Sequence, residues 1–199
     1  GVAWERVSAA RFRFAAAAVA VLLVLGLAAA PIAIPLLPPE RYPAYAQALG
    51  IQPPVDQKDE LGPLPLHFAL RFGWRELVDA VAAAYDGLTP DERAHAAIFA
   101  RSFGETGALN FLGPARGLPR AVSGHNNYWL WGPGHVDGTV VIALAESEGD
   151  LLPYFASVER VSAVDCQYCL PGLRRVSVFV CRGLRRPIEE LWPELKRYV

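Results

Sequence analysis

An uncharged apolar run of 26 residues, from Phe14 to Pro39, constrains this chain more than any other feature. A helix of about 20 residues, rising 1.5 Å per residue, crosses the ~30 Å hydrocarbon core of a bilayer. The run therefore predicts a membrane-spanning helix. Pro31 and Pro35 lack the amide donor that a continuing helix needs, so we expect the helix to end or kink between Ala30 and Ile34.

Charged residues on the two sides of the run predict its orientation. Arg6, Arg11 and Arg13 precede it, whereas only Glu40 and Arg41 follow immediately. Because positive charge favours the cytoplasmic side, the N-terminus is expected in the cytoplasm and the rest of the chain outside it. The expected location is thus the plasma membrane, with an extracytoplasmic globular domain.

A cleaved signal peptide is a competing interpretation, because Ala28, Ala29 and Ala30 are small residues that follow an apolar stretch. The sequence opens on Gly1 and contains no methionine, which suggests that an upstream part of the protein precedes it. Two further interpretations are then the last span of a longer multispanning protein and a single membrane anchor. Upstream sequence would distinguish them.

Three parts are expected along the chain: residues 1–37 as a cytoplasmic flank and transmembrane helix, residues 38–64 as a proline-rich linker, and residues 65–199 as one α/β domain. A short helix is expected within the linker, at residues 42–49. The last part is long enough to bury a core of its own. A net charge of −1 without a basic block argues against nucleic acid as a partner.

Apolar spacing within the domain predicts alternating helices and strands. Residues 74–85 show one buried helix face, and Thr89, Pro90 and two acids form the start of another helix. The alternation predicts an α/β fold with three layers and a mixed, largely parallel sheet. Expected strands are residues 96–100, 120–122, 139–144, 158–164 and 175–181, and further expected helices are residues 108–112, 151–156 and 187–198.

A glycine-containing turn at residues 102–107 follows the first expected strand. Its Gly104-x-x-Gly107 spacing matches neither a dinucleotide fingerprint nor a phosphate-binding loop, so no nucleotide cofactor is predicted. Glu105 has two interpretations. It either stabilises the start of the helix or contacts a ligand directly, since ligands bind at strand ends in such sheets.

The densest polar and aromatic segment, residues 123–133, follows the second expected strand. His and Asn side chains supply donors and acceptors, and Tyr and Trp supply flat apolar faces with a polar tip, a mixture that suits sugar recognition. The alternative is that the tryptophans anchor the core and the asparagines hold a turn. The candidate substrate-binding residues are His125, Asn126, Asn127, Tyr128, Trp129 and Glu105.

The three cysteines, Cys166, Cys169 and Cys181, lie in the last third of the chain. In an oxidising compartment they favour a disulfide, with Cys181 paired to Cys166 or Cys169. Unpaired buried thiols, or a metal or redox role for the Cys-x-x-Cys pair, are the alternatives. The histidines lack the spacing of helical ligands, so no metal site is predicted.

Several motifs together carry a resemblance to a known family. They are Leu64-Pro65-Leu66-His67-Phe68, Arg71-Phe72-Gly73-Trp74, Ala97-Ile98-Phe99, Gly104-Glu105-Thr106-Gly107-Ala108, Ser123-Gly124-His125-Asn126-Asn127-Tyr128-Trp129-Leu130-Trp131-Gly132 and Val180-Cys181-Arg182-Gly183. Over most of its length the chain resembles the C-terminal extracytoplasmic domain of bacterial glycosyltransferase family 39 proteins. These are similar to dolichyl-phosphate-mannose-protein mannosyltransferases and lipid A aminoarabinose transferases.

The resemblance implies a GT-C type transferase that moves a sugar from a polyprenyl-phosphate carrier to an extracytoplasmic acceptor. The family's catalytic carboxylates lie in loops between early transmembrane helices, which this sequence does not contain, so no catalytic residue is assigned. The chain would supply the last span and an accessory soluble domain, with the membrane, the upstream transmembrane region and the lipid-linked sugar donor as partners. The alternative is a membrane-anchored carbohydrate- or protein-binding module without catalysis.

Overall fold

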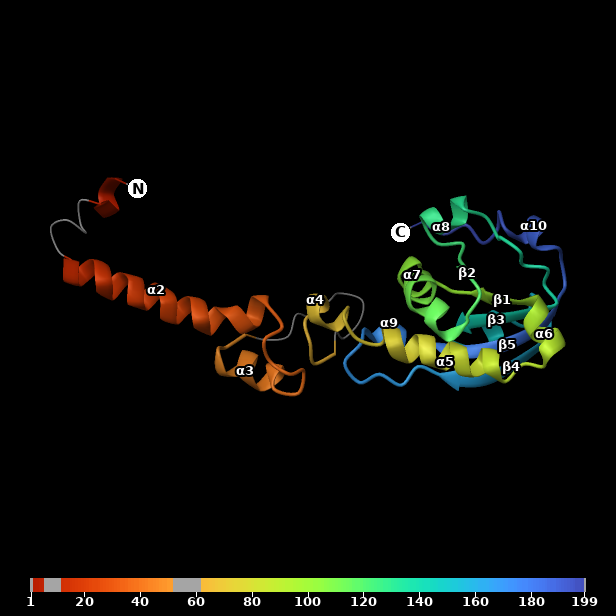
Figure 1. Ribbon diagram of the computed structural model, residues 1–199, viewed down its shortest axis with the longest axis horizontal. Coiled ribbons are helices and arrows are strands. Elements are labelled where there is room, and N and C mark those ends of the chain that lie inside the picture. The colour runs from red at the N-terminus through yellow and green to blue at the C-terminus, as the bar shows by residue number, and fades with distance from the viewer. Residues whose placement is uncertain (1, 6–11, 52–61, 199) are drawn as a thin grey trace.

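The N-terminal helix α2 runs from Phe12 to Ala33 and is long and apolar enough to span a membrane. A computed structural model describes residues 2–5, 12–51 and 62–198. The helix ends within the predicted interval, in the turn that contains Pro31. Figure 1 shows α2 projecting away from the sheet. Arg6, Arg11 and linker residues 52–61 lie outside the described residues.

A small apolar cluster packs near the C-terminal end of α2. Its helices are α3 (Tyr42–Ala48), which confirms the short helix expected in the linker, and α4 (Leu66–Ala69). The Tyr45 hydroxyl donates a 2.5 Å hydrogen bond to the Ala28 carbonyl of α2. The segment expected to be a linker therefore contains a helix with tertiary contacts. The cluster consists of Tyr42, Ala46, Leu64, Phe68 and Ala69, with Ile32, Phe72, Tyr168 and Leu170 packed against it.

The domain is α/β, and its mixed sheet has the strand order β2-β1-β3-β5-β4 in the described part of the chain. The β2-β1 and β1-β3 ladders are parallel, whereas β3-β5 and β5-β4 are antiparallel. Strand β5 therefore runs against its two neighbours, and only half of the ladders match the expected parallel pairing. The strands are β1 (Ala96–Phe99), β2 (Ala121–Val122), β3 (Val140–Ala145), β4 (Phe155–Ala163) and β5 (Ser177–Leu184).

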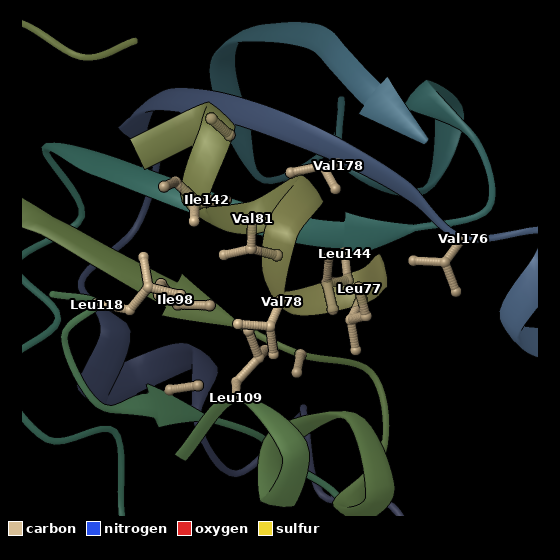
Figure 2. Close-up of a cluster of buried hydrophobic side chains, with 14 of the residues drawn as sticks. Leu77, Val78, Val81, Ile98, Leu109, Leu118, Ile142, Leu144, Val176 and Val178 are labelled. Carbon is tan, nitrogen blue, oxygen red and sulfur yellow. The ribbon is translucent and has the colours of Figure 1, made fainter. Parts of the chain in front are cut away.

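Strand β3 lies at the centre of the core, because all six of its residues are buried. Its side chains alternate between two apolar clusters, one on each face of the sheet. Helices α5 (Trp74–Asp86) and α7 (Phe103–Leu112) contribute to the first cluster. Figure 2 shows residues of α5, among them Leu77 and Val81, pointing onto Ile142 and Leu144 of β3.

The second face of the sheet is covered mainly by irregular chain and short helices. The four-residue helix α10 (Ile188–Leu191) packs there with Val136, Leu151 and Trp192. The domain also contains short elements that are not all on this face: α6 (Pro90–His95), η1 (Gly113–Arg116), α8 (Asn127–Leu130), η2 (Glu148–Asp150) and α9 (Pro171–Arg174).

One predicted helix is wrong, and another is shorter than predicted. Residues 151–154 form turns, and β4 begins at Phe155, which pairs with Leu184 of β5. The C-terminal helix stops at Leu191, and Pro193 lacks the amide donor that a continuing helix needs there. By contrast, the helix start at Thr89 is confirmed, with a capping box between Thr89 and Glu92.

The expected disulfide to Cys181 is not formed, and all three cysteines are free thiols. Cys181 belongs to the second cluster, whereas Cys169 and the partly buried Cys166 belong to the first, so the sheet separates them. Burial raises the pKa of the Cys169 and Cys181 thiols to about 12, which keeps both protonated at neutral pH.

The position of β3 generates a stability prediction. Ile142→Ala removes a fully buried side chain and should lower the free energy of unfolding by about 2–5 kcal/mol. Leu152→Ala, at a 47% exposed leucine, should change it by less than about 1 kcal/mol. Urea denaturation followed by tryptophan fluorescence measures both. Equal losses in the two variants would contradict the assignment of β3 to the centre of the core.

Candidate functional site

A cavity of about 590 Å³ runs along β3 on the second face of the sheet and reaches the carboxyl ends of strands β1 and β3. After β1 the chain enters α7 on the first face of the sheet, and after β3 it continues through residues 146–154, which pack on the second face. Neighbouring strands whose loops diverge in this way leave a crevice, where α/β sheets bind ligands.

The cavity has an apolar interior and a polar end. Its floor is formed by Val141, Ala143 and Ala145 of β3, and its walls include Phe155, Ile188 and Leu191. The polar end contains Arg101, which follows β1, His125, which follows β2, Glu146, which follows β3, and Arg197 near the C-terminus. Three parallel strands thus each deliver one polar residue to the same edge of the sheet.

Glu105 does not line this cavity, and its acceptor capacity is used within the fold. The side chain is buried, with an exposed fraction of 3%. Its Oε2 accepts the backbone N–H groups of Arg101 and Ser102, at 2.9 and 3.2 Å. Its Oε1 accepts two bonds from the Arg101 guanidinium, at 2.8 and 3.2 Å. This geometry agrees with the interpretation of Glu105 as a stabiliser of the helix start.

Arg101 is also occupied at its other donors. Its Nη1 lies 3.0 Å from a Glu146 carboxylate oxygen, and its Nη2 donates to the Gly172 carbonyl at 3.0 Å. The ends of β1 and β3 and the start of α9 are therefore tied together by one guanidinium. Arg101 shapes the cavity wall but has little donor capacity left for a ligand.

His125 differs from these neighbours because one of its ring nitrogens is unused. Its exposed fraction is 7%, and Nδ1 accepts the Phe103 backbone N–H at 3.0 Å. Burial, and secondarily the charge of Arg197, lowers the pKa of His125, so the ring is neutral at pH 7. The proton of the neutral ring must then be on Nε2, which has no hydrogen-bond partner among the described residues.

Backbone pairing holds His125 next to the C-terminal segment. The Asn126 N–H donates to the Arg197 carbonyl at 2.8 Å, and the Arg197 N–H donates to the Gly124 carbonyl at 2.9 Å. Only glycine fits at position 124, since a Cβ atom there would lie 2.0 Å from the Leu195 carbonyl oxygen. His125 and Arg197 consequently sit side by side at the polar end.

Helix α8 directs the other candidate residues away from the cavity. Asn127 is exposed, and Tyr128 packs edge-on against Trp131 with ring centroids 4.6 Å apart. Trp129 and Trp192 each donate an indole N–H to the other's backbone carbonyl, at 2.9 and 3.0 Å. Of the six candidate residues, His125 alone lines the cavity.

The site residues that sequence reasoning missed are Arg101, Glu146 and Arg197. Arg101 and Glu146 could have been found from their positions, because each comes one or two residues after a predicted strand. Glu146 is exposed while also pairing with Arg101. No local pattern indicates Arg197, which reaches the site through tertiary pairing with residue 125.

Within the described residues, no group of three His, Cys, Asp or Glu side chains is placed to hold a metal ion. Comparisons of the chain with protein-family models, with curated protein sequences and with solved structures gave no match. The functional interpretation therefore rests on the geometry of the cavity.

The Glu105 network generates a second stability prediction. Glu105→Ala leaves the Arg101 guanidinium and two backbone N–H groups without their shared acceptor, so the free energy of unfolding should fall by about 2–4 kcal/mol. Glu148→Ala, at an exposed carboxylate of η2, is the control and should cost less than about 0.5 kcal/mol. Unchanged urea midpoints for Glu105→Ala would show that the network contributes nothing.

Two adjacent asparagines should differ sharply in their effect on stability. Asn126 has a backbone φ of 51°, which alanine adopts at a cost of about 1 kcal/mol and glycine adopts freely. Asn126→Ala should therefore destabilise the domain more than Asn126→Gly does, whereas Asn127→Ala at the exposed neighbour should be nearly neutral. Thermal melts monitored by circular dichroism test this order, and an equal effect of the two alanine variants would refute it.

Proposed function

We propose that this chain is the membrane-anchored, ligand-binding part of an integral-membrane glycosyltransferase. The transferase would move a sugar from a polyprenyl-phosphate carrier to an acceptor outside the cytoplasm. Helix α2 would be its last span, and its catalytic groups would lie in membrane-embedded loops that precede this chain. The domain would be extracytoplasmic, with the membrane, the transmembrane region and the lipid-linked sugar donor as partners and no role for nucleic acid.

The observation that carries this proposal is the buried Nε2–H of His125 at a strand-end cavity. A buried donor without a partner costs free energy that a bound acceptor would recover. The cavity also lies where α/β sheets hold their ligands. The Gly-His-Asn-Asn-Tyr-Trp segment that carries the resemblance to family 39 transferases includes this histidine.

A second candidate is a carbohydrate- or protein-binding module that is anchored in the membrane and performs no catalysis. Two observations favour it. The polar end contains no nucleophile paired with a base, and Arg101 and Glu105 are occupied by one another. The two candidates differ in whether changes at His125 alter sugar transfer or only ligand binding.

Substitutions at His125 can separate a functional role from a structural one. Asparagine places an acceptor near the position of Nδ1 and lacks the Nε2 donor, whereas glutamine places a donor near Nε2 and lacks the Nδ1 acceptor. His125→Asn should keep the bond from Phe103 and lower sugar transfer about tenfold or more. His125→Gln should lower the melting temperature but retain transfer when assayed below that temperature.

The measurement is transfer of radiolabelled sugar from a polyprenyl-phosphate donor, made in membranes that contain the natural protein at matched expression. Wild-type transfer in His125→Asn would reject the role of Nε2. Absence of any transfer in the wild-type protein, together with glycan binding that depends on His125, would support the binding module instead.

Chemical labelling tests the proposed orientation. Ala94→Cys places a thiol on the exposed surface of α6, and Ala97→Cys places one at a buried position of β1 as a matched control. A membrane-impermeant maleimide should modify Ala94→Cys in intact cells and leave Ala97→Cys and the unaltered chain largely unmodified. Modification of Ala94→Cys only after cell lysis would place the domain in the cytoplasm and contradict the proposal.

A further inference from the structure

The interior of the cavity along β3 is mainly apolar, and Ser147, Asp150 and Tyr154 are the polar lining residues besides those already named. Its floor and walls beyond the polar end are aliphatic and aromatic, contributed by Val141, Ala143, Phe155, Ile188 and Leu191. A sugar hydroxyl placed there would lose its hydrogen bonds to water without gaining others. An alkyl chain would instead exchange water contact for apolar contact, which is favourable. The interior therefore fits a hydrocarbon rather than a glycan.

The polar end has carboxylate acceptors at Glu146 and Asp150 and two donors without a carboxylate partner among the described residues, at His125 and Arg197. The Nε2–H of His125 has no acceptor among the described residues, and the Arg197 guanidinium forms no ion pair with a described carboxylate. The carboxylates there are engaged within the fold, since Glu146 pairs with Arg101 and Arg175, and Asp150 accepts the Ser147 backbone N–H at 2.9 Å. The end thus offers one neutral donor and one cation to an oxygen-bearing group.

The apolar helix α2 affects which ligands can reach this cavity, because it places the domain near a membrane. It is long and apolar enough to lie in a bilayer. The apolar cluster of α3 and α4 packs its end, through Ile32, against residues that precede α9, among them Leu170. A domain attached in this way stays close to a membrane surface, where single-chain amphiphiles are concentrated.

We propose that the cavity binds a single-chain amphiphile, with its hydrocarbon chain along β3 and a carboxylate or phosphate head group held by His125 and Arg197. This inference rests on the proposed function only for the membrane location of the domain. It goes further in naming the ligand class. The head-group oxygen would accept the Nε2–H of His125 and face the Arg197 guanidinium, and the chain would contact Val141, Ala143 and Phe155.

Photolabelling of the full chain in lipid nanodiscs tests the proposal. The probe is palmitic acid that carries a diazirine near the end of its chain, and cross-linked peptides are mapped by mass spectrometry. Label is expected on peptides that contain residues 140–145, 151–155 or 188–191, in addition to α2. Label confined to α2 and other lipid-facing residues would overturn the proposal, because the probe would then have entered only the bilayer.

Two variants of cavity residues and one control variant test which side chains hold the probe. Ala143→Leu fills the floor of the cavity, and Arg197→Gln removes the cation at an exposed side chain that should not affect folding. Arg197→Gln should lower cavity labelling about tenfold at an unchanged melting temperature, and Ala143→Leu should lower it in protein that still gives a cooperative melt. Arg116→Gln, at an exposed arginine paired with Asp79, should not lower it. Unchanged labelling in both cavity variants would refute the assignment.

Competition identifies the head group. Excess unlabelled palmitate or hexadecyl phosphate should suppress cavity labelling, and the stronger competitor shows whether the natural head group is a carboxylate or a phosphate. Hexadecanol should compete poorly because it lacks an oxyanion, and equal competition by hexadecanol would contradict the role of Arg197. Cavity labelling of the wild-type protein, together with normal sugar transfer in His125→Asn, would retain this inference and reject the role of His125 in transfer. Impaired transfer without cavity labelling would do the reverse.

Discussion

The buried carboxylate of Glu105 is the interaction on which the shape of the site depends. It accepts four hydrogen bonds from the backbone and side chain of Arg101 and from Ser102, so the turn after β1 has one conformation and α7 starts at a fixed place. Through Arg101 the same carboxylate reaches Glu146 after β3 and the carbonyl of Gly172. Burying a lone carboxylate would cost free energy. Here the ion pair with Arg101 and the four hydrogen bonds offset that cost.

His125 differs from its polar neighbours because one of its ring nitrogens has no hydrogen-bond partner among the described residues. Around it, a carboxylate, a guanidinium and several backbone amides each have partners, which is the rule for buried polar atoms. His125 uses one nitrogen to accept from the first turn of α7 and keeps the other as an unpaired donor. The neutral state of the ring follows from burial and from the neighbouring Arg197, so the donor persists at neutral pH without a counterion.

Local sequence signals predicted the parts of the fold that local interactions determine. The helix start at Thr89 was predicted from its N-cap, and the run of apolar residues in β3 identifies a strand buried on both faces. The capping box at Ser102, by contrast, starts α7 at Phe103, where a turn was expected. The span ends at Pro31 and its neighbours for a reason that is visible in one residue type. These features depend on residues that are close together in the sequence.

Features that depend on distant partners could not be predicted in the same way. The direction of β5 depends on which strands it meets, and Pro193 shortens a helix whose apolar spacing looked continuous. For the polar-aromatic segment, the one turn of α8 sends its side chains in different directions, so adjacency in sequence did not give a shared surface. Arg197 joins His125 only through a β-bridge between segments far apart in the chain.

The reciprocal pair of Trp129 and Trp192 has a consequence for motion. Two indole-to-carbonyl bonds and the short bridge at Arg197 attach the C-terminal segment, which supplies one wall of the cavity, to α8. Segments held by few contacts detach with a smaller free energy than global unfolding requires. Loss of either indole bond would therefore loosen residues 188–198, and an occupant of the cavity that packs against Ile188 and Leu191 would stabilise the same wall.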